Sequence, residues 1–242
     1  MKEILFLSIA CVVLGTGLGA FLGIFWGLKT IGKTMAFTGG LMIGIVFLDL
    51  LPESLACGNL FIVTISLFIG IFFVALISEL ISTKDNVHNQ NKSALFKVGI
   101  VLMIAMALHN FPEGMAIGSS GAVDFESGLL VAFMITLHDI PEGMAIAAPL
   151  VAGHIKKTKV FFLTIISGIS TILGTLFGLW VGRLSDFGLA FCLASAGGAM
   201  LYIVFGELIP KANQELKDKN SAFITIIGII VGIILLKIIR LY

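Results

Sequence analysis

The chain has 242 residues, of which 58% are hydrophobic and only 12% are charged, and its formal net charge is +1. Its mean hydropathy is +1.12. Soluble domains carry about 25% charged residues, so this composition excludes a water-soluble fold. Because no basic patch is present, it also gives no reason to expect a nucleic-acid partner. The lipid bilayer is the first partner to expect.

The apolar runs predict an all-α integral membrane protein with eight transmembrane helices. A run of about 18 or more apolar residues is long enough to cross a bilayer. The predicted spans cover residues 4–28, 34–51, 60–81, 95–118, 128–151, 160–182, 187–209 and 222–239. The first run is too long for the apolar region of a signal peptide, and we therefore treat it as a span.

The basic residues predict how the spans are oriented. Of the 15 Lys and Arg residues, 11 lie in the connections after the first, third, fifth and seventh spans. Cytoplasmic loops carry an excess of positive charge. We therefore expect both termini to be extracytoplasmic.

Two internal repeats relate the ends of the chain. GGLMIGIVFLDLLP at 39–52 recurs as GGAMLYIVFGELIP at 197–210, with eight of 14 residues identical and an offset of 158. LGTGLGAFLG at 14–23 recurs near the same offset as LGTLFGLWVG at 173–182. The predicted orientation makes these copies inverted, which is typical of secondary transporters. An old duplication without transport is the alternative.

The repeats predict one transmembrane domain over residues 1–242 in a 3+2+3 arrangement. Repeat one covers residues 4–81, a central helix pair covers 95–151, and repeat two covers 160–241. Glycines at every fourth position of the first and sixth spans form ridges that allow close helix approach. We expect both ridges to pack on the central pair.

A third repeat contains the histidines and glutamates that are the candidate functional residues. HNFPEGMAIG at 109–118 recurs as HDIPEGMAIA at 138–147, with seven of ten residues identical. His109 and Glu113 are four residues apart, as are His138 and Glu142, so each pair shares one helix face. Ionisable side chains this deep in a predicted span are costly and usually functional.

A divalent metal ion explains this set of side chains. Two neutral imidazoles and two carboxylates carry a charge of −2, which one divalent cation neutralises. Asp139 leaves one negative charge in excess, which could carry a proton or help to hold a second ion. Nitrogen and oxygen ligands suit zinc, iron(II), manganese, cobalt and cadmium. The three cysteines have no paired spacing, so we expect neither a thiolate site nor a resident cofactor.

These motifs resemble those of the ZIP family of divalent-metal transporters, of the bacterial zinc-uptake kind. HNFPEG at 109–114 and HDIPEG at 138–143 match the signature on that family's fourth and fifth helices, and the resemblance covers essentially the whole chain. It implies that the principal metal is held by His109, Glu113, His138 and Glu142. It also implies that Asn110 and Asp139 contribute to a neighbouring second metal position.

The resemblance further implies inward transport across the plasma membrane by a homodimeric, elevator-type carrier. Helices one, four, five and six would slide against the other four. The chain departs from the family at Thr171, because many bacterial members carry there a glutamate that ligates the second metal. The loop at 82–94 holds only His88, where the family often has several histidines. We therefore expect neither a full two-metal site nor metal capture by that loop.

Further residues are candidates for the transport path. Asp49 and Glu53 lie toward the predicted outer end of the second span, and Glu207, the repeat counterpart of Asp49, lies near the predicted cytoplasmic exit. Met42 recurs as Met200 and is either a thioether ligand or a core side chain. The acids Asp124 and Glu126 are either part of a cation-attracting mouth or ordinary loop charges.

Two other functions remain open from the residues alone. A metal-selective channel could use the same ligands, and would differ from a carrier by ohmic currents. A membrane-embedded metal hydrolase would need an open coordination position and a base. Since two equivalent halves do not give the asymmetric site that hydrolysis needs, we expect no enzyme.

Overall fold

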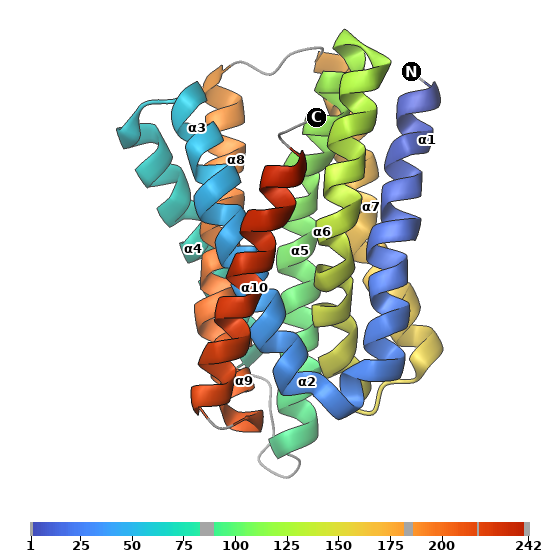
Figure 1. The fold of residues 1–242 in the computed structure, drawn as a ribbon, viewed down its shortest axis with the longest axis vertical. Coiled ribbons are helices and arrows are strands. Elements are labelled where there is room, and N and C mark those ends of the chain that lie inside the picture. Colours follow the sequence, from blue (N-terminus) through green and yellow to red (C-terminus); the bar gives the residue numbers. More distant parts are fainter. Residues whose placement is uncertain (1, 83–89, 182–185, 217, 240–242) are drawn as a thin grey trace. The chain divides into compact units, whose positions relative to one another are not determined.

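The computed structural model describes residues 2–82, 90–181, 186–216 and 218–239, and within these ranges all regular structure is helical (Figure 1). The α-helices and three short π-helices, labelled η, have the following bounds: α1 Lys2–Cys11, η1 Val12–Gly17, α2 Leu18–Ile45, η2 Val46–Leu50, α3 Leu51–Cys57, α4 Leu60–Ser82, α5 Gln90–Val123, α6 Phe125–Ala152, α7 Lys157–Val181, α8 Asp186–Ile203, η3 Val204–Leu208, α9 Ile209–Glu215 and α10 Asp218–Ile239. The predicted loop at 82–94 with His88 lies largely outside the described residues.

The predicted number of spans is confirmed: the described residues hold eight helical segments that are long and apolar enough to cross a membrane. Their bounds are Lys2–Phe25, Ile31–Cys57, Leu60–Leu80, Leu95–Ala122, Phe125–Ala152, Lys157–Trp180, Asp186–Glu215 and Lys219–Lys237. Large apolar side chains such as Phe61, Phe72 and Trp180 are exposed, as suits a surface in contact with lipid. The chain is a multi-pass integral membrane protein.

The structure corrects three predicted boundaries. The connection expected after residue 28 is helical, because α2 runs without a break from Leu18 to Ile45. The second and seventh spans, which we expected to end at residues 51 and 209, also continue through the prolines that follow, to Cys57 and Glu215. Pro52 and Pro210 stand in the first turns of α3 and α9, each directly after a π-helix. A proline that begins a new helical segment loses no hydrogen bond that the segment needs.

The chain divides into two compact units. The first unit comprises Met1–Leu28 and Val87–Ser185, and the second comprises Lys29–Asn86 and Asp186–Tyr242. The first unit therefore holds the first, fourth, fifth and sixth spans, and the second unit holds the other four.

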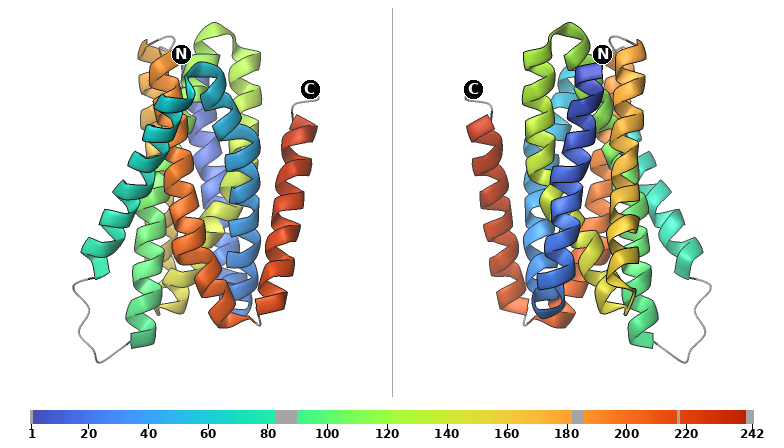
Figure 2. Two further views of the ribbon diagram at one scale, coloured as in Figure 1. Left: turned by 90° about the vertical axis from the view of Figure 1, so that its left-hand side faces the viewer. Right: turned by 90° about the vertical axis from the view of Figure 1, so that its right-hand side faces the viewer.

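In the first unit, α5 packs on both α6 and α7, while α1 and η1 pack on α6 (Figures 1 and 2). The glycine ridges make these contacts close. A Cβ atom on Gly174 would meet the backbone carbonyl of Phe111, and one on Gly19 would meet the carbonyl of Ile140. Both ridges thus pack on the central helix pair, as predicted.

The packing corrects the register of one predicted repeat. Phe111 and Ile140 are equivalent positions of the central motifs, 29 residues apart, so Gly19 corresponds in space to Gly174. The sequence match had paired Gly15 with Gly174, one helical turn away. Glycine at every fourth residue gives the same pattern after a shift of one turn, and only the contacts distinguish the two registers.

In the second unit, the two repeats contact each other reciprocally. Gly40 approaches the carbonyl of Thr225, and Gly198 approaches the carbonyl of Leu67. Adding 158 to the lower-numbered residue of each pair gives its counterpart in the other repeat: Gly40 becomes Gly198, and Leu67 becomes Thr225. The two halves of this unit are therefore related by an approximate two-fold rotation.

Candidate metal site

His109 lies between two glutamates that come from the two central motifs. Its Nε2 atom is 3.0 Å from Glu113 Oε1 on the same helix and 3.6 Å from Glu142 Oε1 on α6. The exposed fractions of these residues are 1% for His109, 6% for Glu113 and 2% for Glu142. The fold therefore brings side chains from both copies of the motif together in a buried place.

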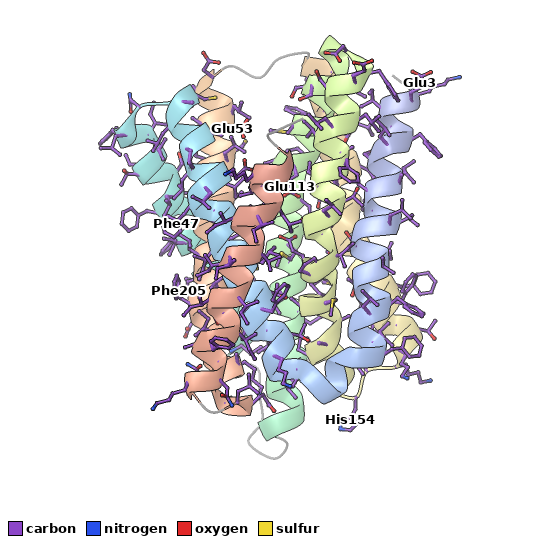
Figure 3. All side chains as sticks on the ribbon, in the orientation of Figure 1. Glu3, Phe47, Glu53, Glu113, His154 and Phe205 are labelled. Carbon is purple, nitrogen blue, oxygen red and sulfur yellow. The ribbon has the colours of Figure 1, made fainter. Side chains whose placement is uncertain are left out.

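The site lies within the first unit, between its two ends. Figure 3 labels Glu3 at one end of this unit, His154 at the other end, and Glu113 between them. The N-terminal end of α1 also lies beside the α5–α6 connection, because a Cβ atom on Gly121 would meet the side chain of Ile4 at 2.5 Å. Glu113 is thus remote from both ends of the first unit.

The structure describes only the backbone of His138, which lies in the middle of α6, one turn before Glu142. Its side chain lies outside the described residues. Among the side chains that the structure does describe, no group of three His, Cys, Asp or Glu residues has an arrangement that could hold a metal ion.

Asp139 forms an acidic flank of the site against η1. Its side chain is 1% exposed, and its Oδ2 atom accepts a hydrogen bond from Thr16 Oγ1 at 3.3 Å. A Cβ atom on Gly15 would lie 2.6 Å from the Cβ of Asp139, so only glycine fits at position 15. One turn before Asp139, Thr136 donates to Cys11 Sγ at 3.1 Å.

The opposite flank, against α7, is neutral. Gly114 approaches the backbone of Thr171, which places Asn110, one turn earlier on the same face of α5, beside α7. Asn110 and Thr171 are buried, and neither Asn110 Oδ1 nor Thr171 Oγ1 has a hydrogen-bond partner among the described residues. Thr171 is the spatial counterpart of Thr16, because Gly114 approaches Thr171 as Gly143 approaches Thr16, and Asn110 is the motif counterpart of Asp139.

The remaining path candidates belong to the second unit. Met42 and its repeat counterpart Met200 are fully buried, as core side chains are. Asp49 lies half-buried in η2, and Glu53 is exposed in α3 (Figure 3). Glu207 lies in η3 and accepts a hydrogen bond from Ser78 Oγ at 3.0 Å.

Asp124 has a structural role at the start of α6. It is the N-cap residue, and its carboxylate accepts from the backbone N–H of Ser127 at 2.8 Å and from the Ser127 hydroxyl at 2.7 Å. These hydrogen bonds hold the pKa of Asp124 below its usual value. Helix capping therefore accounts for this acid without a cation-attracting mouth.

Two polar side chains were missed by the sequence reasoning. Thr16 contacts Asp139, and Ser78 contacts Glu207. A hydroxyl inside an apolar span usually bonds to a carbonyl of its own helix, as Ser66 does to Ile62. Nothing in the sequence distinguishes Ser78, which bonds to another helix, from Ser66, which bonds within its own. The position of Thr16 within a glycine ridge, in contrast, could have indicated a contact with the central helix pair.

The buried side chains of His109, Glu113 and Glu142, contributed by two copies of one motif within a set of membrane-spanning helices, characterise the chain as a polytopic membrane protein with a buried polar centre. Comparison with known proteins agrees with this class. The family model described as ZIP Zinc transporter matches residues 78–240. The chain belongs to the ZIP family.

Curated bacterial relatives span nearly the same length. A protein named Zinc transporter ZupT from Chlorobium chlorochromatii is 33% identical over 93% of this chain and 92% of its own length. Its namesake from Chlorobium luteolum is 35% identical over 84% of this chain and 83% of its own length. One from Streptococcus mutans is 28% identical over 93% of this chain and 94% of its own length.

Proposed function

We propose that this protein is a carrier that takes up divalent metal ions, above all zinc, across the bacterial plasma membrane. The observation that carries the proposal is the convergence of His109, Glu113 and Glu142 from both central motifs in a buried place. Membership of a family of transporters supports transport rather than catalysis. The names of the relatives support zinc as the ion.

His109, Glu113, His138 and Glu142 are the proposed ligands. Two carboxylates buried beside each other repel strongly unless a cation or protons compensate them. A divalent ion bound between the two glutamates removes this cost. Because imidazole and carboxylate also accept iron(II), manganese, cobalt and cadmium, these ions are the expected competitors of zinc.

We expect one principal metal ion in each chain. A second ion on the α7 side would meet Asn110 and Thr171, which bring no charge. On the other side, Asp139 is the acid that the described side chains place on a flank, and it accepts a hydrogen bond from Thr16. The α7 flank therefore lacks the negative charge that would bind a second divalent ion there.

We propose an elevator-type mechanism in which the first unit carries the metal. The resemblance assigns helices one, four, five and six to the moving part, and the chain divides into compact units between the same helices. The close glycine contacts within each unit support movement as rigid bodies. The reciprocal contacts of the second unit support the 3+2+3 inverted arrangement. The distribution of Lys and Arg residues supports extracytoplasmic placement of both termini.

Labelling of single cysteines tests this mechanism. In a background without Cys11, Cys57 and Cys192, zinc should change the reactivity of a cysteine at Ser119 in the first unit. A cysteine at Leu55, which is exposed in the second unit, should react at an unchanged rate. Equal changes at both positions would contradict movement of the first unit alone.

The remaining proposals concern the path and the assembly. Asp49, Glu53 and Glu207 are proposed transit residues of the second unit, and Met42 is a weaker candidate because it is buried like its counterpart Met200. The resemblance favours a homodimer, which mass measurement in detergent tests directly.

Uptake of zinc into vesicles tests the function itself. Purified protein in proteoliposomes should give uptake that saturates with zinc concentration. Ohmic zinc currents in planar bilayers would instead support the channel alternative, and an absence of any zinc flux through well-folded protein would reject both.

A further inference from the structure

The acidic residues of the first unit avoid one of its two ends. The unit contains six acids: Glu3, Glu113, Asp124, Glu126, Asp139 and Glu142. Three of them are buried in the central motifs. The other three lie at the end where the α5–α6 connection meets the start of α1. The opposite end, which Figure 3 marks with His154, therefore has no acid in the described part of this unit.

Lysines gather at this second end from two parts of the unit. Three exposed lysines follow α6 or stand in the first turn of α7. A half-buried lysine of α5 lies near them, because a Cβ atom on Gly153 would be 3.1 Å from the backbone nitrogen of Phe96, the residue before it. Together these four side chains are named the basic cluster: Lys97, Lys156, Lys157 and Lys159. Four positive charges thus meet at an end where the unit supplies no negative one.

The connection that carries three of these lysines is a defined turn. The N–H of His154 bonds to the carbonyl of Val151 at 2.9 Å, and the N–H of Ile155 bonds to that of Leu150 at 3.1 Å. This pair of hydrogen bonds is a Schellman motif, which ends a helix with one residue in the left-handed region. His154 takes that position with a φ of 65°. The backbone therefore holds the lysines that follow at fixed places on the surface of the unit.

One lysine of the cluster reaches the side of the unit that faces lipid. The Nζ atom of Lys157 lies 4.8 Å from the ring centroid of Phe25, a cation–π contact. Phe25 is 53% exposed, and its ring lies 4.7 Å from that of Phe21, which is 51% exposed. Both rings belong to the first membrane span. An ammonium group at the end of such an apolar column stands at the level of the lipid headgroups.

We infer that the basic cluster is a binding site for the headgroup of an anionic phospholipid. The distribution of basic residues predicts that this end of the unit is cytoplasmic, and clusters of about four to eight Lys or Arg residues beside a span bind anionic lipids there. Ammonium groups donate hydrogen bonds to phosphate oxygens, while the exposed ring of Phe25 offers an apolar contact to the acyl chains. The position beside the bilayer favours a lipid over a dissolved anion, because the lipid is concentrated where the cluster lies.

Titration of the purified protein in detergent with phosphatidylglycerol, followed by native mass spectrometry, tests this inference. Each lysine near such a site contributes about fivefold to the affinity. The double variant Lys156→Gln with Lys159→Gln should therefore bind phosphatidylglycerol about 25-fold more weakly than the wild type. Lys156→Arg with Lys159→Arg keeps both charges and should bind it as the wild type does. Phosphatidylcholine, which has no net charge, should bind equally to all of these proteins.

A single lysine at the other end of the same unit provides the matched control. Lys2→Gln should leave the affinity for phosphatidylglycerol unchanged, whereas Lys159→Gln alone should lower it about fivefold. Equal affinity of the wild type and the double glutamine variant would overturn the inference. Displacement of the lipid by an excess of inorganic phosphate would also overturn it, because the cluster would then bind dissolved anions. The titration contains no zinc, so its outcome is independent of whether the protein transports zinc.

Discussion

Replacement of Gly143 by alanine tests whether close helix packing holds the metal ligands in place. Gly143 follows the proposed ligand Glu142, and a Cβ atom there would lie 2.5 Å from the backbone carbonyl oxygen of Thr16. Ordinary contacts of a Cβ atom begin near 3.4 Å. Because a backbone atom cannot turn aside as a flexible side chain can, α6 and η1 must separate by about 0.9 Å, the difference between these two distances.

The expected cost follows from that displacement. Overpacking of this kind costs about 1–3 kcal/mol of stability, and a shift of about 1 Å in a binding group can cost on the order of 100-fold in function. We therefore expect Gly143→Ala to lower the unfolding temperature and to weaken zinc binding at least tenfold. Thermal unfolding and zinc titration calorimetry in detergent measure the two effects.

Gly17→Ala is the matched control on the facing segment. Its nearest neighbour would be the Cδ1 atom of Ile165 at 3.1 Å, the flexible end of a side chain. This variant should fold and bind zinc nearly as the wild type does. Wild-type stability and zinc affinity in Gly143→Ala would refute the reasoning that close contact between α6 and η1 sets the ligand geometry.

Three further predictions concern other parts of the chain. Wild-type protein should bind one zinc ion per chain, and Thr171→Glu, which adds an acid beside Asn110, should raise the number toward two in equilibrium dialysis. Neutralising Asp49 and Glu53 together should raise the KM for zinc uptake, and an unchanged KM would remove them from the path. Asp124→Ala should speed amide hydrogen exchange in the first turn of α6, whereas Asp124→Asn should not, because asparagine is also a good N-cap. Since the pKa of Asp124 is lowered in the folded state, the cap stabilises the helix above the usual aspartate pKa and is lost as pH falls through the lowered value; exchange that is independent of pH would contradict this.

The sequence predicted the spans and the meeting of the motifs for definite physical reasons. Long apolar runs leave few alternatives to membrane helices, and spacing of four residues places His109 and Glu113 on one face. Adjacent helices that carry the same motif then bring Glu142 to the same place. The structure bears out this contact between motifs at 3.6 Å.

Other features needed the structure because their sequence signals are degenerate. A glycine ridge repeats every turn, so the match of Gly15 with Gly174 was one turn away from the true contact. Ser78 and Ser66 look alike in sequence, yet only Ser78 reaches another helix. The continuity of α2 across residues 29–33 was missed because polar residues there suggested a loop, although nothing in that segment prevents a helix.

Uptake of labelled zinc by proteoliposomes holding wild-type protein, Glu142→Ala or Glu126→Ala tests the central claim most directly. Glu142 is 2% exposed beside His109, whereas Glu126 is exposed in the first turn of the same helix. The account predicts saturable uptake by the wild type and by Glu126→Ala, its loss in Glu142→Ala, and competition by manganese and iron(II). Full uptake by a folded Glu142→Ala variant would contradict the claim that the central motifs hold the transported metal.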